Sequence, residues 1–144
     1  MSEKTDIEQL LRSGTPVGFK PQGNSMHPTI VNGRDSVIIE PLGNRKLKRG
    51  DVALFRRSKD APKYGGMLVL HRVHSVKKDG IYMVGDNEKE IEGPLADEQF
   101  IGIMTELIRK GKHISEKNLF YRFLTRSWLF VRPFRFIFTG KNRK

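Results

Sequence analysis

Two residues of this chain carry side chains that could together attack a peptide bond. Ser25 lies in a polar turn sequence, Gly-Asn-Ser-Met-His-Pro-Thr at 23–29, and His71 lies in the apolar run 67–73. A serine hydroxyl becomes an effective nucleophile when a neighbouring base takes its proton, and a neutral imidazole can be that base near neutral pH. The chain has no cysteine, which excludes a cysteine nucleophile, a disulfide framework and a thiolate zinc site. We therefore expect a Ser25–His71 dyad, and no metal or cofactor.

The body of the chain has the pattern of an all-β domain. Short runs rich in Val, Ile, Leu and Phe alternate with turn residues and predict strands at 17–20, 36–40, 51–56, 68–76, 81–84 and 100–109. Asp79-Gly80 between two of these runs is typical of a tight hairpin turn. Strand alternation places His71 on a face with aliphatic residues and turns His74 to the other face, which disfavours a His-x-x-His metal pair. We therefore predict a mainly β fold, either an open sheet or a partly open barrel.

Two helices are expected outside this body. Apolar residues at helical spacing predict a short N-terminal helix at 6–13. Near the other end, Phe120, Leu124 and Trp128 recur every four residues and predict a basic amphipathic helix from 119 to about 131, interrupted near Pro133. The net charge of the chain is +11, and residues 109–144 carry +10 of it together with six of the nine Phe. We divide the chain into an N-terminal helix (1–14), a catalytic β domain (15–110) and a basic aromatic tail (111–144).

Four short motifs give the chain a family resemblance. They are Ser-Met-His-Pro-Thr at 25–29, Gly-Asp-Val-Ala-Leu-Phe at 50–55, His-Arg-Val at 71–73 and Gly-Asp-Asn at 85–87. In this order, across residues 15–105, they resemble the sequence boxes of the type I signal peptidases and of their clan relatives, the LexA-type self-cleaving repressors. Most bacterial signal peptidases have a lysine at the position of His71. The histidine makes this chain similar to the endoplasmic-reticulum type.

This resemblance implies a signal-peptidase-like or LexA-like fold, a partly open β-barrel. It also implies that Ser25 is the nucleophile and His71 the general base of a serine endopeptidase that cleaves a leader or precursor peptide. In the histidine-containing subgroup an acidic residue shortly after Gly-Asp-Asn assists the histidine. Glu92 is our first candidate for that residue, and Asp86 is the second. The transmembrane anchor of signal peptidases and the DNA-binding domain of the repressors have no counterpart in the sequence.

The sequence leaves other functions open. The same fold could be a non-catalytic module that binds a peptide or a membrane, or a regulator that cleaves itself. The tail could pack on its own sheet or bind an anionic membrane surface, because arginines and aromatic residues suit lipid headgroups. We do not expect nucleic acid as a partner. Residues 1–14 are polar and no apolar run is long enough to span a bilayer, so we expect a cytoplasmic location with, at most, peripheral contact with the membrane.

Overall fold

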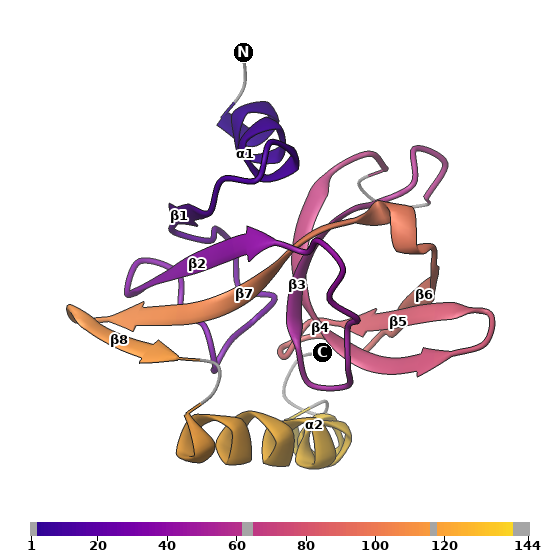
Figure 1. Ribbon diagram of the computed structural model, residues 1–144. Helices are drawn as coiled ribbons and strands as arrows, with labels where there is room; N and C mark the ends of the chain where they lie inside the picture. The colour runs from indigo at the N-terminus through magenta and orange to yellow at the C-terminus, as the bar shows by residue number, and fades with distance from the viewer. Residues whose placement is uncertain (1–2, 62–64, 116–117, 140–144) are drawn as a thin grey trace.

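Eight antiparallel strands form one sheet at the centre of the structure (Figure 1). The computed structural model describes the backbone of residues 3–61, 65–115 and 118–139, and within them the side chains of residues 7–61, 65–115, 118–119 and 121–131. The strands are β1 (Val17–Phe19), β2 (Asp35–Pro41), β3 (Val52–Arg56), β4 (Leu68–Lys77), β5 (Gly80–Val84), β6 (Glu92–Leu95), β7 (Phe100–Arg109) and β8 (Lys112–Ser115). Neighbouring strands follow the order β1-β2-β7-β3-β4-β5-β6, and β8 pairs with β7. The sheet is not closed, and the prediction of a mainly β fold is confirmed.

The six strands predicted from the sequence are all present, with ends that move by one residue at most. The predicted hairpin is also present, because Lys77 pairs with Gly80 across the turn between β4 and β5. The prediction missed β6 and β8. The first contains Pro94, which a strand tolerates only at the edge of a sheet, and β6 is such an edge strand. β8, at the start of the expected tail, has too few apolar residues to show a strand pattern.

β3 lies in the middle of the sheet and is buried on both faces. Val52 and Leu54 belong to one apolar core, whereas Ala53 and Phe55 belong to a second one. Successive side chains of a strand point to opposite faces, so the two cores lie on opposite sides of β3. Ala53 pairs with His71 of β4. The strand that carries the expected base is thus held beside the most deeply buried strand of the sheet.

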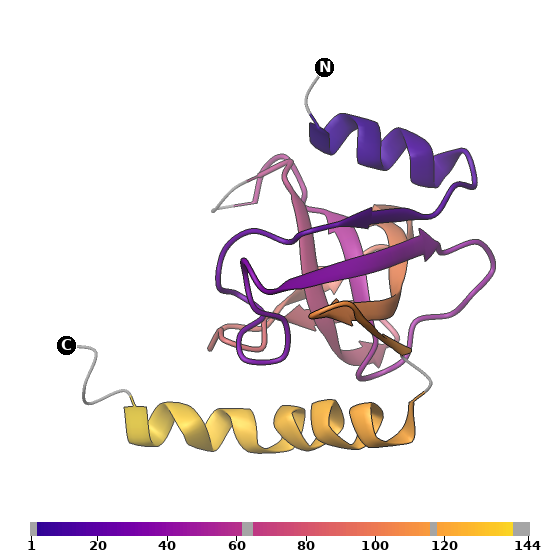
Figure 2. The ribbon, with the colours of Figure 1, turned by 90° about the vertical axis from the view of Figure 1, so that its left-hand side faces the viewer.

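Helices α1 (Glu3–Arg12) and α2 (Leu119–Thr139) lie on opposite sides of the sheet (Figure 2), and the short 3-10 helix η1 (Asp97–Gln99) precedes β7. α1 packs on the sheet through Leu11, which is almost fully buried, and Glu8 pairs with Arg56 at the end of β3. The predicted N-terminal helix is therefore confirmed, although it begins three residues earlier than expected.

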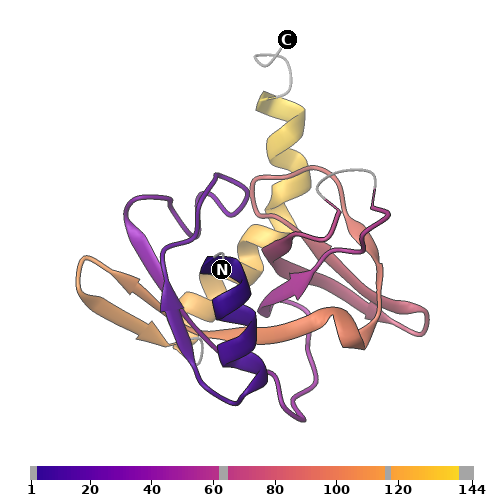
Figure 3. The ribbon, with the colours of Figure 1, turned by 90° about the horizontal axis from the view of Figure 1, so that it is seen from above.

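α2 continues through Pro133, so the interruption predicted there is wrong. A proline inside a helix removes one backbone hydrogen bond, but the helix can bend at that point without ending. Asn118 caps the start of α2, because its Oδ1 accepts a hydrogen bond from the Tyr121 N–H at 3.0 Å. The last part of α2 extends past the strands (Figure 3). Among the described residues, no helix combines the length and the apolar character needed to cross a membrane.

The face of α2 that packs on the body coincides only in part with the face that Phe120, Leu124 and Trp128 share by their spacing. The side chains that are buried or half-buried there include those of Tyr121, Arg122, Thr125, Trp128 and Leu129. Of the predicted face, Trp128 packs inward, Leu124 is about half exposed, and the side chain of Phe120 lies outside the described residues. Thr125 can occupy the buried face because its hydroxyl donates to the backbone oxygen of Tyr121 at 3.1 Å. A pattern of apolar residues alone overlooks Thr125, because the hydrogen bond of its hydroxyl is made within its own helix.

Candidate active site

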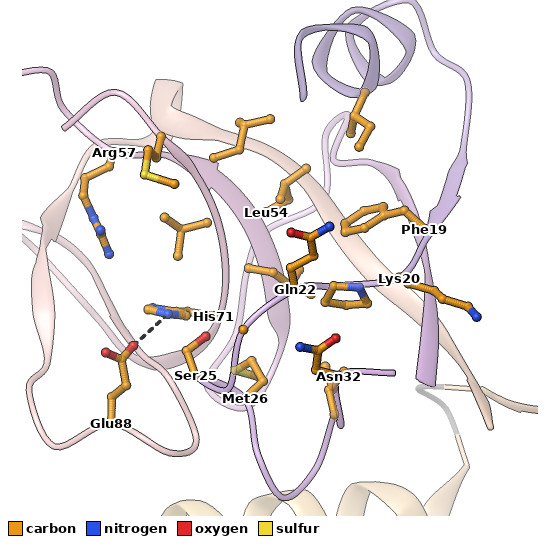
Figure 4. Close-up of a pocket in the computed structure, with 18 residues that line it drawn as sticks. Phe19, Lys20, Gln22, Ser25, Met26, Asn32, Leu54, Arg57, His71 and Glu88 are labelled. Atoms are coloured by element: carbon orange, nitrogen blue, oxygen red, sulfur yellow. Dashed lines mark ion pairs between the residues drawn. The ribbon is translucent and has the colours of Figure 1, made fainter. Parts of the chain in front are cut away.

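A cleft at the start of β4 brings Ser25 and His71 together. The cleft has a volume of about 520 Å³, and both side chains line it along with apolar residues from α1, β1, β3 and β4. Figure 4 shows Ser25 and Glu88 next to the imidazole of His71 at one end of this cleft. The hydroxyl of Ser25 makes no hydrogen bond within the described part of the chain. The two residues of the expected dyad therefore share one site, although they are far apart in the sequence.

The backbone at Ser25 is held against the turn at residues 85–88. The N–H of Asn87 donates to the carbonyl oxygen of Ser25 at 2.8 Å. A Cβ atom at Gly85 would lie 2.6 Å from that oxygen and 2.7 Å from Oε1 of Glu88, closer than real contacts allow. Only glycine therefore lets the two loops approach this closely. The contact sets the position of the nucleophile relative to Glu88.

His71 reaches the cleft from β4 with a side chain that is only 7% exposed. Its ring meets the ring of Phe55 edge to face, with centroids 6.1 Å apart. Nε2 lies 3.0 Å from Oε1 of Glu88, an ion pair when the ring is protonated, whereas Nδ1 is buried and has no hydrogen-bond partner among the described residues. A neutral imidazole carries one N–H, so the contact with Glu88 favours the tautomer with the proton on Nε2 and the lone pair on Nδ1.

Glu92, the first candidate for orienting His71, binds Arg57. The two side chains form a bidentate pair, with Nε to Oε2 at 2.8 Å and Nη2 to Oε1 at 2.7 Å. The pKa of Arg57 is raised, first by its hydrogen bonds with Glu92 and further by the negative charges of Glu92 and Glu88. Arg57 also lines the cleft. The structure thus pairs Glu92 with Arg57, and the carboxylate beside His71 is that of Glu88 instead.

Asp86, the second candidate, forms a buried ion pair with Arg72. Its Oδ1 accepts from Arg72 Nε at 2.9 Å and its Oδ2 accepts from Arg72 Nη2 at 2.8 Å, and the hydroxyl of Thr29 also donates to Oδ2. Burial alone would lower the pKa of Arg72, but the charge and hydrogen bonds of Asp86 outweigh it and raise that pKa. Asp86 therefore anchors the loop of Ser25 to β4, the strand of His71.

A second buried carboxylate, Asp35, anchors the far end of the Ser25 loop. Oδ2 accepts from the Val31 N–H at 2.8 Å, and Arg109 donates to Asp35 Oδ1 and to the carbonyl oxygen of Thr29, both at 3.0 Å. Burial alone would raise the pKa of Asp35, but hydrogen bonds from Arg109, Arg34 and the Val31 N–H lower it to about 2. Ionised Asp35 thus holds both the loop and the adjoining strand β7.

Glu88 is the residue that sequence reasoning missed. It is one of three glutamates in the run 88–92, which reads as a solvated loop. Its N–H donates to the carbonyl oxygen of Gly85 at 2.8 Å, which closes a four-residue turn and directs Glu88 back toward His71. Gly-Asp-Asn is a turn signal, and that signal could have identified Glu88.

Comparisons with known proteins associate no family with the chain. No family model, no curated protein and no solved structure matches it. Its function is therefore inferred from the chemistry of the cleft itself.

Proposed function

We propose that this chain is a serine endopeptidase of the signal-peptidase type, with Ser25 as nucleophile, His71 as general base and Glu88 as the residue that positions His71. One observation carries the proposal. In the cleft that Ser25 lines, one imidazole nitrogen lies 3.0 Å from Glu88, and the other is buried without a hydrogen-bond partner in the described part of the chain. Buried polar atoms without partners are uncommon and call for an explanation. We propose that this buried nitrogen takes the proton of Ser25 during the reaction.

The proposed reaction proceeds through an acyl-enzyme. Oγ of Ser25 attacks the carbonyl carbon of the scissile bond while its proton passes to the ring nitrogen that Glu88 does not hold. The C–N bond then breaks, and His71 gives that proton to the leaving amine. Water attacks the resulting ester with the same imidazole as base, which releases the carboxylic acid and restores the Ser25 hydroxyl. The carboxylate of Glu88 stabilises the transient imidazolium and keeps the ring in place.

The oxyanion of the tetrahedral intermediate needs hydrogen-bond donors close to Ser25. Within the described part of the chain, the backbone N–H groups of Ser25 and Met26 donate to no protein acceptor. The turn is fixed by the bond from Asn87 and by the anchors at Asp86 and Asp35. We propose that these two N–H groups bind the oxyanion without having to break an existing bond.

An extended leader or precursor peptide is the substrate that best suits the cleft. β1 forms one edge of the sheet, and an exposed edge can pair with an added strand. Phe19 of β1 and Leu68 of β4 both line the cleft, so a peptide between these strands would meet apolar walls on both sides. The open sheet with a cleft at this position is compatible with the partly open barrel of signal peptidases and LexA-like proteins, which we propose as the fold.

The most direct test is covalent labelling by a fluorophosphonate, which phosphonylates activated serines with loss of fluoride and needs no knowledge of the natural substrate. We expect mass spectrometry to place the label on Ser25, with labelling lost in Ser25→Ala and strongly slowed in His71→Ala. Ser127→Ala, which removes a hydroxyl outside the cleft, is the matched control and should be labelled like the wild type. Labelling of His71→Ala at the wild-type rate would contradict the dyad. A panel of leader-type peptides then tests cleavage with the same variants.

The absence of a hydrogen bond from the Ser25 hydroxyl in the described part of the chain supports a second candidate function. A non-catalytic module could use the same cleft to bind an extended peptide. It would bind leader-type peptides without labelling of Ser25 and without cleavage. The self-cleaving regulator predicted as a further alternative would instead produce specific fragments of the chain on incubation, and Ser25→Ala would abolish them.

A further inference from the structure

The side of α2 that faces away from the body exposes large apolar side chains. Leu119, Phe123 and Phe130 are 80%, 68% and 72% exposed, and Leu124 and Val131 are about half exposed. We call these five residues the outer face. The first three share one side of the helix by their spacing, opposite the side that packs on the body. An apolar surface of this kind on a folded protein commonly marks an interaction site.

Basic residues border the outer face. Arg126 is exposed and passes over Gly50, where a Cβ atom would lie 3.3 Å from the Arg126 Nε, and the half-buried Arg122 lies one turn before it. Residues 109–144 carry a net charge of +10 with Glu116 as their only acid, while residues 1–108 carry +1. A long basic side chain beside an apolar surface can extend its charge to the level of lipid phosphates. The charge of the molecule is therefore concentrated in the segment that exposes the apolar side chains.

An anionic lipid surface suits both features. Two copies that met through their outer faces would bring two segments of charge +10 together, and this repulsion opposes a dimer. A nucleic acid would match the charge but would leave large aliphatic side chains in water. The headgroup region of a bilayer accepts apolar side chains below the phosphates and basic groups among them.

We infer that the outer face of α2 is a peripheral docking surface for anionic lipid bilayers. The helix lies along one side of the body, opposite α1, and extends past the strands, so a flat surface can reach it along its length (Figures 2 and 3). On its inner side the indole N–H of Trp128 donates to the carbonyl oxygen of Asp86 at 3.0 Å. The docked helix is thereby tied to the turn at 85–88, and docking holds the cleft at a fixed distance from the bilayer.

The test uses the full chain and vesicles of two compositions, phosphatidylcholine alone and phosphatidylcholine with phosphatidylglycerol in equal parts. We expect the protein to float with the anionic vesicles and to remain unbound with the neutral ones. The double variant Phe123→Ser/Phe130→Ser should lose at least about tenfold in affinity, because burial of each phenyl ring favours the bound state. The matched control Leu10→Ser/Val76→Ser removes two exposed apolar side chains from other parts of the molecule and should bind like the wild type.

Each other outcome overturns the inference. Equal flotation with both vesicle types would show that lipid charge does not contribute to binding. No flotation would show that the outer face does not bind bilayers. Equal losses in the two double variants would show non-specific adhesion. A concentration-dependent dimer that Phe123→Ser/Phe130→Ser abolishes, without vesicle binding, would identify the outer face as a contact between copies. Circular dichroism confirms that the variants are folded, and Ser25→Ala should bind vesicles like the wild type, which separates docking from the proposed catalysis.

Discussion

Replacement of Asp86 by asparagine tests whether Asp86 serves to stabilise the fold, in contrast to Glu88, which we propose positions His71. Asp86 is fully buried, and its partner Arg72 is 1% exposed. The asparagine keeps the size of the side chain but removes its charge, so the guanidinium of Arg72 stays buried without a counter-ion. Breaking a buried ion pair on one side costs roughly 3–5 kcal/mol, and asparagine can still accept one hydrogen bond, so we expect a loss near the lower end, about 3 kcal/mol. For a chain of this length the midpoint of thermal unfolding should fall by roughly 6–12 °C.

Urea unfolding measures this loss with two probes. The only tryptophan of the chain, Trp128, donates to the backbone of Asp86, so its fluorescence follows the region of the change. Circular dichroism follows the whole sheet, and coincident transitions would support a single cooperative unfolding. The double variant Arg72→Met/Asp86→Leu is the control, because it removes both charges. We expect it to be more stable than Asp86→Asn alone.

Two results would refute this reasoning. A loss of stability below about 1 kcal/mol in Asp86→Asn would show that the Arg72 charge is not isolated in the protein interior. A large loss of serine labelling in Asp86→Asn, measured on the folded fraction and with stability unchanged, would show that Asp86 acts on His71 directly.

The remaining predictions concern Glu88, Asp35 and Gly85. Glu88→Gln should lower the rate of Ser25 labelling by about 100-fold with little change in the urea midpoint, whereas Glu92→Gln should lower it by less than about tenfold; equal effects would contradict the role of Glu88. The Asp35 pKa of about 2 lies below its ordinary value of 3.8. Asp35 therefore stabilises the fold by about 2 kcal/mol above pH 4, and this contribution should disappear as the pH falls toward 2. In urea titrations against pH, Asp35→Asn should be less stable than the wild type at neutral pH and should lose less stability on acidification. Gly85→Ala should reduce both stability and labelling, because its methyl group would displace Ser25 or Glu88, and unchanged labelling would contradict that close contact.

The proposed dyad could be selected from the sequence because each member belongs to a local pattern. Ser25 lies in a turn sequence, and the alternation of β4 places His71 on the face of Val69 and Val73, which belong to the same core as Phe55. The acid could not be selected this way. Glu88 and Glu92 both follow Gly-Asp-Asn in the chain, and the turn at 85–88 together with the position of Arg57 decides which of them reaches the imidazole.

The buried side of α2 could not be predicted from the sequence for a related reason. Helical periodicity fixes which residues share a face, but contacts with the body decide which face is buried. Tyr121 packs against the first core and Leu129 is buried, while Thr125 between them satisfies its own hydroxyl. Of the residues selected by spacing alone, Leu124 is about half exposed although Trp128 packs inward. For the same reason the sequence did not show which apolar residues form the outer face.

The two acids of the turn, Asp86 and Glu88, have different environments, and this difference is the reason why we assign them different roles. Both carboxylate oxygens of Asp86 are bound by Arg72, and one also accepts from Thr29, so its charge is already neutralised. Such a carboxylate has little capacity left to stabilise a second cation. The side chain of Glu88 is 47% exposed and lies 3.0 Å from Nε2 of His71, so in the proposed reaction water can solvate it while the imidazole gains and loses its proton. The site needs a buried ion pair to fix the Ser25 loop and a solvated carboxylate to balance the charge of the imidazole. The turn at 85–88 supplies both, the first through Asp86 and the second, in the proposed reaction, through Glu88.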